Sequence, residues 1–219
     1  MVHTYSPRRN VKVEPTLKVI SADTKIVSGV VNQSDLIYTA RGVPVPLRNQ
    51  FVGQRLFLLL SGPSASCLDL SLLNSRGCVV MATNNAWSLH RPRFWVGVDS
   101  PGSFLDQGWK DPGIVKFTCF AHVDGRLRTK QENGTFRKSQ FLVRDMPSVF
   151  FFRRRDGFDP ETFLTEPVIS WGTSKDTKDA LGISNARSVM LCALKIAVWL
   201  GFTEIYLLGC DFNMPLDSN

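Results

Sequence analysis

The feature that most constrains the fold is a stretch near the end of the chain, residues 183–214, in which an apolar helical pattern runs directly into an apolar strand pattern. Apolar side chains recur at helical spacing as far as Leu200, and Gly201 can adopt the left-handed backbone that ends a helix. Residues 204–208 then form a short β-rich run. A helix this apolar, joined by a tight turn to a buried strand, is typical of an α/β protein with a parallel sheet.

Polar residues mark both ends of this stretch. We expect Ser184 or Asn185 to cap the helix, because a short oxygen-bearing side chain can accept a hydrogen bond from a first-turn amide. On the helix, three side chains are expected in solvent: Arg187, Ser188 and Lys195. Gly209, Cys210 and Asp211 follow the strand pattern, so Asp211 lies at a carboxyl end, where open α/β sheets bind their ligands.

Further apolar runs of strand length predict the rest of the sheet, at residues 56–60, 78–82, 94–98, 114–120 and 148–152. We therefore expect one α/β domain over residues 51–219, with a mostly parallel sheet. Residues 1–50 contain short β-like runs broken by Pro and Gly, and predict an irregular or β-rich extension that packs on this domain.

A polar turn, Ser61-Gly62-Pro63-Ser64, follows the first of these runs. Gly62 would let the backbone approach a ligand closely, and Pro63 has no amide hydrogen to leave unsatisfied. Ser64 can donate to a phosphate at the start of a helix expected over residues 65–74. An ordinary strand-to-helix turn with a serine cap explains the same residues.

Other polar residues follow the next two strand patterns. Asn84 and Asn85 carry both donors and acceptors that suit a base edge or a sugar hydroxyl, although asparagines also favour turns. Asp99 is either a functional carboxylate or a turn residue. Asp99 and Asp211 are far apart in the chain, and we expect them to converge at one edge of the sheet.

Basic residues are concentrated in two places. Asn133-Gly134 suits a type I′ hairpin turn, and its flanks form an inserted basic β-hairpin with Arg126, Arg128, Lys130, Arg137 and Lys138. The hairpin is either solvated or steers an anionic acceptor. Three adjacent arginines, residues 153–155, stand at a strand end where they could meet a phosphate, but nearby acidic residues partly neutralise them, so a solvated rim is expected.

The composition favours a cytoplasmic protein with small anionic ligands. A net charge of +7 favours anionic partners, but basic residues scattered through loops disfavour a dedicated nucleic-acid surface. Five cysteines without a C-x-x-C pair indicate neither a disulfide framework nor a zinc site. No run approaches the ~18 apolar residues of a membrane span. Hydrolase, zinc-peptidase and P-loop motifs are absent, and the three histidines lie in separate segments.

Three segments together resemble a known family. FLLLSGPSA, ATNNAW and SVMLCALKIAVWLGFTEIYLLGCDF are similar to the bacterial single-domain sialyltransferases, and to related phage and bacterial proteins that include hydroxymethylpterin pyrophosphokinase-like ones. The resemblance implies a Rossmann-like three-layer fold and a CMP-sialic-acid-like nucleotide-sugar donor, transferred by direct displacement without a cofactor or metal to a glycan or other acceptor.

The resemblance also implies a site. Gly62, Pro63 and Ser64 would lie near the phosphate and sugar, Asn84 or Asn85 near the nucleotide, and Asp211 with Phe212 near the ribose or base. Asn213-Met214 stands where those enzymes carry a tyrosine, and their later tyrosines and histidine would lie beyond Asn219, which favours a truncated domain. A pyrophosphokinase-like transferase and a non-catalytic module, either nucleotide-binding or virion-associated, remain alternatives, and a homo-oligomer stays open.

Overall fold

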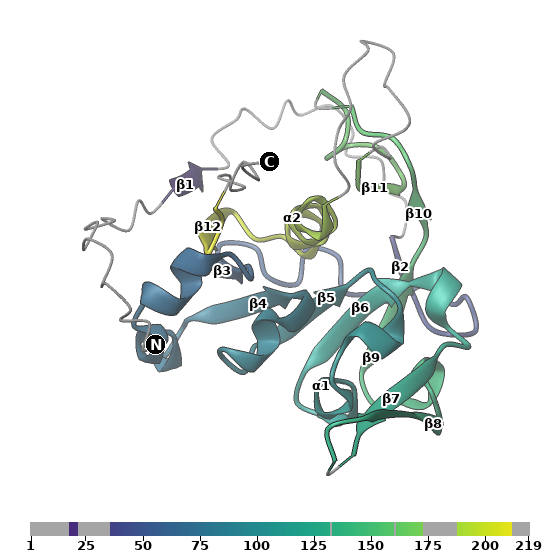
Figure 1. Cartoon of the computed structure of the whole chain (residues 1–219). Coiled ribbons are helices and arrows are strands. Elements are labelled where there is room, and N and C mark those ends of the chain that lie inside the picture. Colours follow the sequence, from purple (N-terminus) through teal and green to yellow (C-terminus); the bar gives the residue numbers. More distant parts are fainter. Residues whose placement is uncertain (1–17, 22–35, 132, 160, 173–187, 212–219) are drawn as a thin grey trace, which may run out of the picture.

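In the computed structural model, one eight-stranded sheet forms the centre of the protein (Figure 1). The structure describes residues 18–21, 36–131, 133–159, 161–172 and 188–211. In spatial order the strands are β1 (Lys18–Ser21), β12 (Glu204–Leu208), β3 (Arg55–Leu59), β4 (Val79–Thr83), β5 (Phe94–Gly97), β6 (Val115–Cys119), β9 (Val149–Phe152) and β2 (Ile37–Tyr38).

The six inner strands are parallel, which confirms the predicted mostly parallel sheet. Only β1 and β2 run antiparallel, each at one edge. Both come from the predicted N-terminal extension, so the described strands of that segment pair directly with the main sheet. The mixed α/β class is thereby established.

Both faces of the sheet are buried, which explains why each inner strand is a nearly continuous apolar run. Along β3, Leu56 and Leu58 belong to one core cluster and Leu59 to the other. The first cluster lies under α2 (Val189–Leu200), which contributes its buried residues Ala193 and Ile196.

The second face is covered by short elements. These are η1 (Pro63–Cys67), η2 (Leu70–Asn74), η3 (Asn84–Ser88), η4 (Pro101–Ser103), α1 (Asp106–Lys110), η5 (Phe120–His122) and η6 (Val143–Asp145). The single helix expected over residues 65–74 is therefore wrong. Asp69 interrupts it, because its side chain accepts from the Ser71 amide and starts a second 3-10 helix. With α1 only five residues long, the finer Rossmann-like three-layer arrangement stays a prediction.

The helix α2 begins later than expected. Ser188 is its N-cap and accepts from the Met190 amide, whereas Ser184 and Asn185 lie outside the described residues. Gly201 ends the helix in the predicted left-handed conformation, with φ of 100°.

The predicted hairpin is present between β6 and β9 as β7 (Arg126–Lys130) and β8 (Phe136–Leu142). Its turn is not the expected two-residue type I′ turn, because the Gln131 amide donates to the Thr135 carbonyl and encloses three residues. A smaller parallel pair, β10 (Arg154–Arg155) and β11 (Ile169–Ser170), follows β9.

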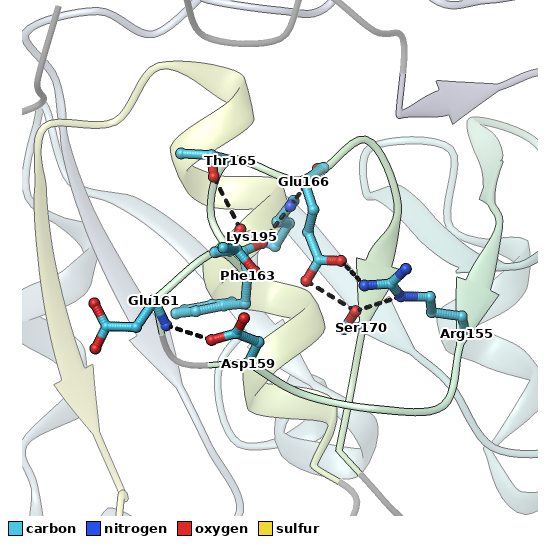
Figure 2. A network of polar contacts seen from close by, with 9 residues as sticks. Arg155, Asp159, Glu161, Phe163, Thr165, Glu166, Ser170 and Lys195 are labelled. Atoms are coloured by element: carbon cyan, nitrogen blue, oxygen red, sulfur yellow. Dashed lines mark hydrogen bonds and ion pairs between the residues drawn. The ribbon is translucent and has the colours of Figure 1, made fainter. Parts of the chain in front are cut away.

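Lys195 is buried rather than solvated, with 2% of its surface exposed. Its Nζ atom donates to the carbonyl oxygens of Phe163 and Glu166, the second at 2.6 Å (Figure 2). The helical pattern cannot reveal this burial, because the covering segment comes from another part of the chain. Burial lowers the pKa of Lys195 to about 8, and the nearby Glu166 carboxylate opposes that shift.

This burial predicts a pH-dependent stability. The folded pKa of about 8 lies below the ordinary value of 10.5, so the unfolded chain holds the proton between these pH values. Stability of the wild type, relative to Lys195→Met, is therefore expected to rise by on the order of 1–2 kcal/mol from pH 7.5 to pH 9.5. Urea unfolding of both proteins at the two pH values measures this. A constant difference would contradict a lysine that is charged and desolvated at neutral pH.

Candidate functional site

The candidate site lies where the strand order reverses. From β3 the chain adds β4, β5, β6 and β9 on one side, then returns through α2 to place β12 on the other side of β3. Open α/β sheets bind ligands beyond the carboxyl ends of their strands at such a switch point. The two loops that meet there are the predicted ones, residues 60–64 and 209–211.

These loops remain hydrogen-bonded beyond the ends of their strands. The Leu60 amide donates to the Leu208 carbonyl at 2.8 Å, and the Gly62 amide donates to the Gly209 carbonyl at 3.0 Å. A Cβ atom on Gly62 would lie 2.4 Å from the Gly209 oxygen. Gly209 has φ of 67°, and a Cβ there would lie 2.6 Å from the Leu60 oxygen. Both positions therefore require glycine.

Asp211 bridges the two loops. Its Oδ2 atom accepts from the backbone amide of Ser64 at 2.7 Å, across 147 positions of sequence. The hydroxyl and amide of Ser64 hold the pKa of Asp211 below its usual value. The carboxylate is exposed, and both of its hydrogen-bonding neighbours in the described part of the chain belong to Ser64.

This contact changes the role expected for Ser64. Its amide, expected to be available to a phosphate, is already used by a carboxylate. Ser64 is the second residue of the five-residue 3-10 helix η1 rather than the start of an α-helix, so the predicted helix-dipole site for a phosphate is absent from these described residues. Pro63 is exposed at the first position of η1.

Asn84 and Asn85 leave the neighbouring strand β4 at the same edge. Asn84 has φ of 45°, an uncommon left-handed backbone for a residue other than glycine. Its main-chain oxygen accepts from Trp95 Nε1 at 2.7 Å. Its buried Oδ1 atom has no hydrogen-bond partner among the described residues, whereas Asn85 is exposed. An unpartnered buried carbonyl of this kind suits a donor group on a ligand.

Asp99 lies farther along the edge, exposed and two residues beyond β5. Its strand is separated from β3 by β4, so Asp99 shares the carboxyl edge with Asp211 but not the switch point. Phe212, the remaining predicted site residue, lies outside the described residues.

Sequence reasoning missed two residues on this edge. His122 Nε2 lies 3.1 Å from the Val98 carbonyl oxygen, and Arg154 Nη1 donates to the same oxygen at 3.3 Å. His122 was given no role because the three histidines lie in separate segments, and Arg154 was expected in a solvated rim. Their positions in the sequence, directly after the strand patterns at 114–120 and 148–152, could have identified both residues as lying at this edge.

Comparisons with known proteins add no assignment, because no protein-family model, curated protein or solved structure matches this chain. Among the described residues, no three side chains of His, Cys, Asp or Glu are grouped so as to hold a metal ion. No helix in the described ranges has the length and apolar character needed to cross a membrane.

Because the backbones of Leu60 and Gly209 lie so close at the switch point, we expect one added methyl group at Gly209 to lower the free energy of unfolding strongly. Gly209→Ala places a Cβ against backbone in a left-handed conformation, whereas Gly53→Ala has a similar φ of 75° but nothing within 4 Å. We expect Gly209→Ala to lower the free energy of unfolding by about 2 kcal/mol more than Gly53→Ala does. Chemical denaturation measures the difference, and equal losses would show that the loops do not approach this closely.

Proposed function

We propose that the protein binds a nucleotide-sugar at the β3–β12 switch point and belongs functionally with glycosyltransferases. The donor proposed is CMP-sialic-acid-like, and the acceptor is a glycan or another hydroxyl-bearing molecule. In such a transfer the acceptor oxygen bonds to the anomeric carbon as the bond from that carbon to the nucleotide phosphate breaks. The nucleotide leaves with the bonding electron pair, and the acceptor proton passes to a base.

The observation that carries this proposal is the exposed Asp211 carboxylate. Its Oδ2 atom is fixed by the Ser64 amide at 2.7 Å, which orients the carboxylate before any ligand arrives. Fixing one oxygen reduces the conformational entropy that a ligand would have to remove. The other oxygen can accept from the vicinal hydroxyls of a ribose, and an ionised acceptor makes these bonds strong.

Asn84 supports a nucleoside rather than a simple sugar. Its unpartnered Oδ1 atom lies one strand away from β3 at the same edge. A carbonyl acceptor suits the exocyclic amino group of cytosine, which donates hydrogen bonds. The assignment of the donor as a CMP-sugar rests on the sequence resemblance, and these two side chains support the nucleotide part of it.

The experiment is a thermal-shift series with CMP, a CMP-sugar and ATP with magnesium. CMP and the CMP-sugar are expected to raise the melting temperature, since a ligand that binds only the folded state stabilises it. Stabilisation by ATP with magnesium alone would favour the pyrophosphokinase-like alternative. No stabilisation by any of these nucleotides would contradict both the proposal and the pyrophosphokinase-like alternative.

Asp211→Ala is expected to weaken CMP binding about tenfold or more, because a charge-assisted hydrogen bond is lost. Asp69→Ala is the matched control, since Asp69 is also exposed and accepts from a serine backbone amide, that of Ser71, at 3.1 Å. Isothermal titration calorimetry with CMP on both variants distinguishes the loss of a ligand contact from the loss of a carboxylate that only binds a backbone amide. Equal CMP affinity in Asp211→Ala and Asp69→Ala would remove Asp211 from the site.

A further inference from the structure

The three adjacent arginines after β9 have three different environments. Arg153 is exposed. Arg155 is ion-paired with Glu166, whose other carboxylate oxygen accepts from the Ser170 hydroxyl (Figure 2). Arg154 is half-buried and takes part in none of the ion pairs found among the described residues. A half-buried cation without a carboxylate partner needs a separate explanation.

Neutral groups hold Arg154 in place. Its guanidinium carbon lies 3.6 Å from the centroid of the Trp171 ring, and its Nη1 atom donates to the Val98 carbonyl at 3.3 Å. Trp171 is itself oriented, because its Nε1 atom donates to Asp156 Oδ1 at 2.8 Å. Stacking on an indole fixes the plane of the guanidinium but does not neutralise it.

Among the described residues, Arg154 donates to the Val98 carbonyl and also interacts with the Cys119 thiol, and it has no carboxylate partner. Val98 O also interacts with His122 Nε2 at 3.1 Å, so both lone pairs of that carbonyl are engaged. Burial raises the pKa of the nearby Cys119 thiol to about 11, so this thiol stays neutral and leaves the charge of Arg154 in place. Asp99 follows Val98 directly but is not within the 4.0 Å ion-pair distance of Arg154.

We infer that Arg154 anchors a second ligand subsite, which takes a carboxylate or phosphate group of a small molecule at the carboxyl ends of β6 and β9. A planar guanidinium with free N–H groups matches two oxygens of such a group in a bidentate pair. The fixed plane reduces the entropy lost on binding. The flanking positive charge of Arg153 adds to the attraction for an anion.

This subsite is separate from the switch point. The Arg154 guanidinium contacts the Val98 carbonyl, which follows β5, and two strand spacings of ~4.8 Å place β5 roughly 10 Å from β3 along the sheet. Anion binding at Arg154 does not depend on the proposed function. If that function holds, the second subsite selects an anionic acceptor or the anionic far end of the donor.

The test follows the Nε–Hε signals of arginine side chains in the ¹⁵N-labelled full chain by NMR. Sodium phosphate and sodium pyruvate are titrated separately at constant ionic strength, with sodium chloride as the reference salt. Arg154→Lys assigns the Arg154 signal and keeps the charge, whereas Arg154→Gln removes it. Arg153→Gln is the matched control, since it removes one adjacent charge from an exposed side chain.

We expect the Arg154 signal to move saturably with phosphate, pyruvate or both, and the difference between the two titrations identifies the preferred group. Followed at the indole N–H signal of Trp171, which the Arg154 side chain contacts, Arg154→Lys is expected to weaken this binding about tenfold because the bidentate geometry is lost, while Arg153→Gln changes it less than about twofold. A non-saturating shift, or equal shifts at Arg153 and Arg154, would overturn the inference. The titration of the wild type alone shows whether the Arg154 signal moves saturably, so it tests the inference even where a variant fails to fold. Loss of CMP binding in Asp211→Ala with intact phosphate binding would separate the two sites.

Discussion

The carboxyl edge of the sheet depends on the contact between two loop backbones that lack side chains where they meet. Gly62 and Gly209 continue the β3–β12 pairing beyond the strands, and a single Cβ at either position would lie within 2.6 Å of a main-chain oxygen. This approach brings Asp211 to the Ser64 amide. The same residues that close the sheet at its switch point therefore also orient the exposed carboxylate.

Much of the sheet could be predicted from the sequence, because a parallel strand buried on both faces is apolar at almost every position. The runs at residues 56–60, 78–82 and 94–98 correspond to β3, β4 and β5 within one or two residues. Features that depend on one side-chain hydrogen bond, or on a segment distant in the sequence, were harder to predict. Asp69 divides the expected helix because its side chain binds the Ser71 amide, and the burial of Lys195 depends on a segment about thirty positions earlier in the chain.

The candidate site could be predicted in part, for the same topological reason. Parallel strands place their carboxyl ends at one edge, so Asp211, Asn84 and Asp99 were expected there and lie there. The pairing of Asp211 with Ser64 was not predictable, because nothing in the pattern shows which amide a carboxylate will accept from. Arg154 was expected in a solvated rim because nearby acidic residues suggested neutralisation, but among the described residues Arg155 alone of the three arginines forms an ion pair, with Glu166.

We propose that Asp211 binds the vicinal hydroxyls of a ribose at the switch point. The most direct measurement compares the affinities of CMP and 2′,3′-dideoxy-CMP for the wild type and for Asp211→Ala by calorimetry. We expect the wild type to prefer CMP by about tenfold or more, since two hydroxyl donors are lost in the analogue, and we expect the preference to disappear in Asp211→Ala. An equal preference for CMP in both proteins, or no preference in the wild type, would contradict it.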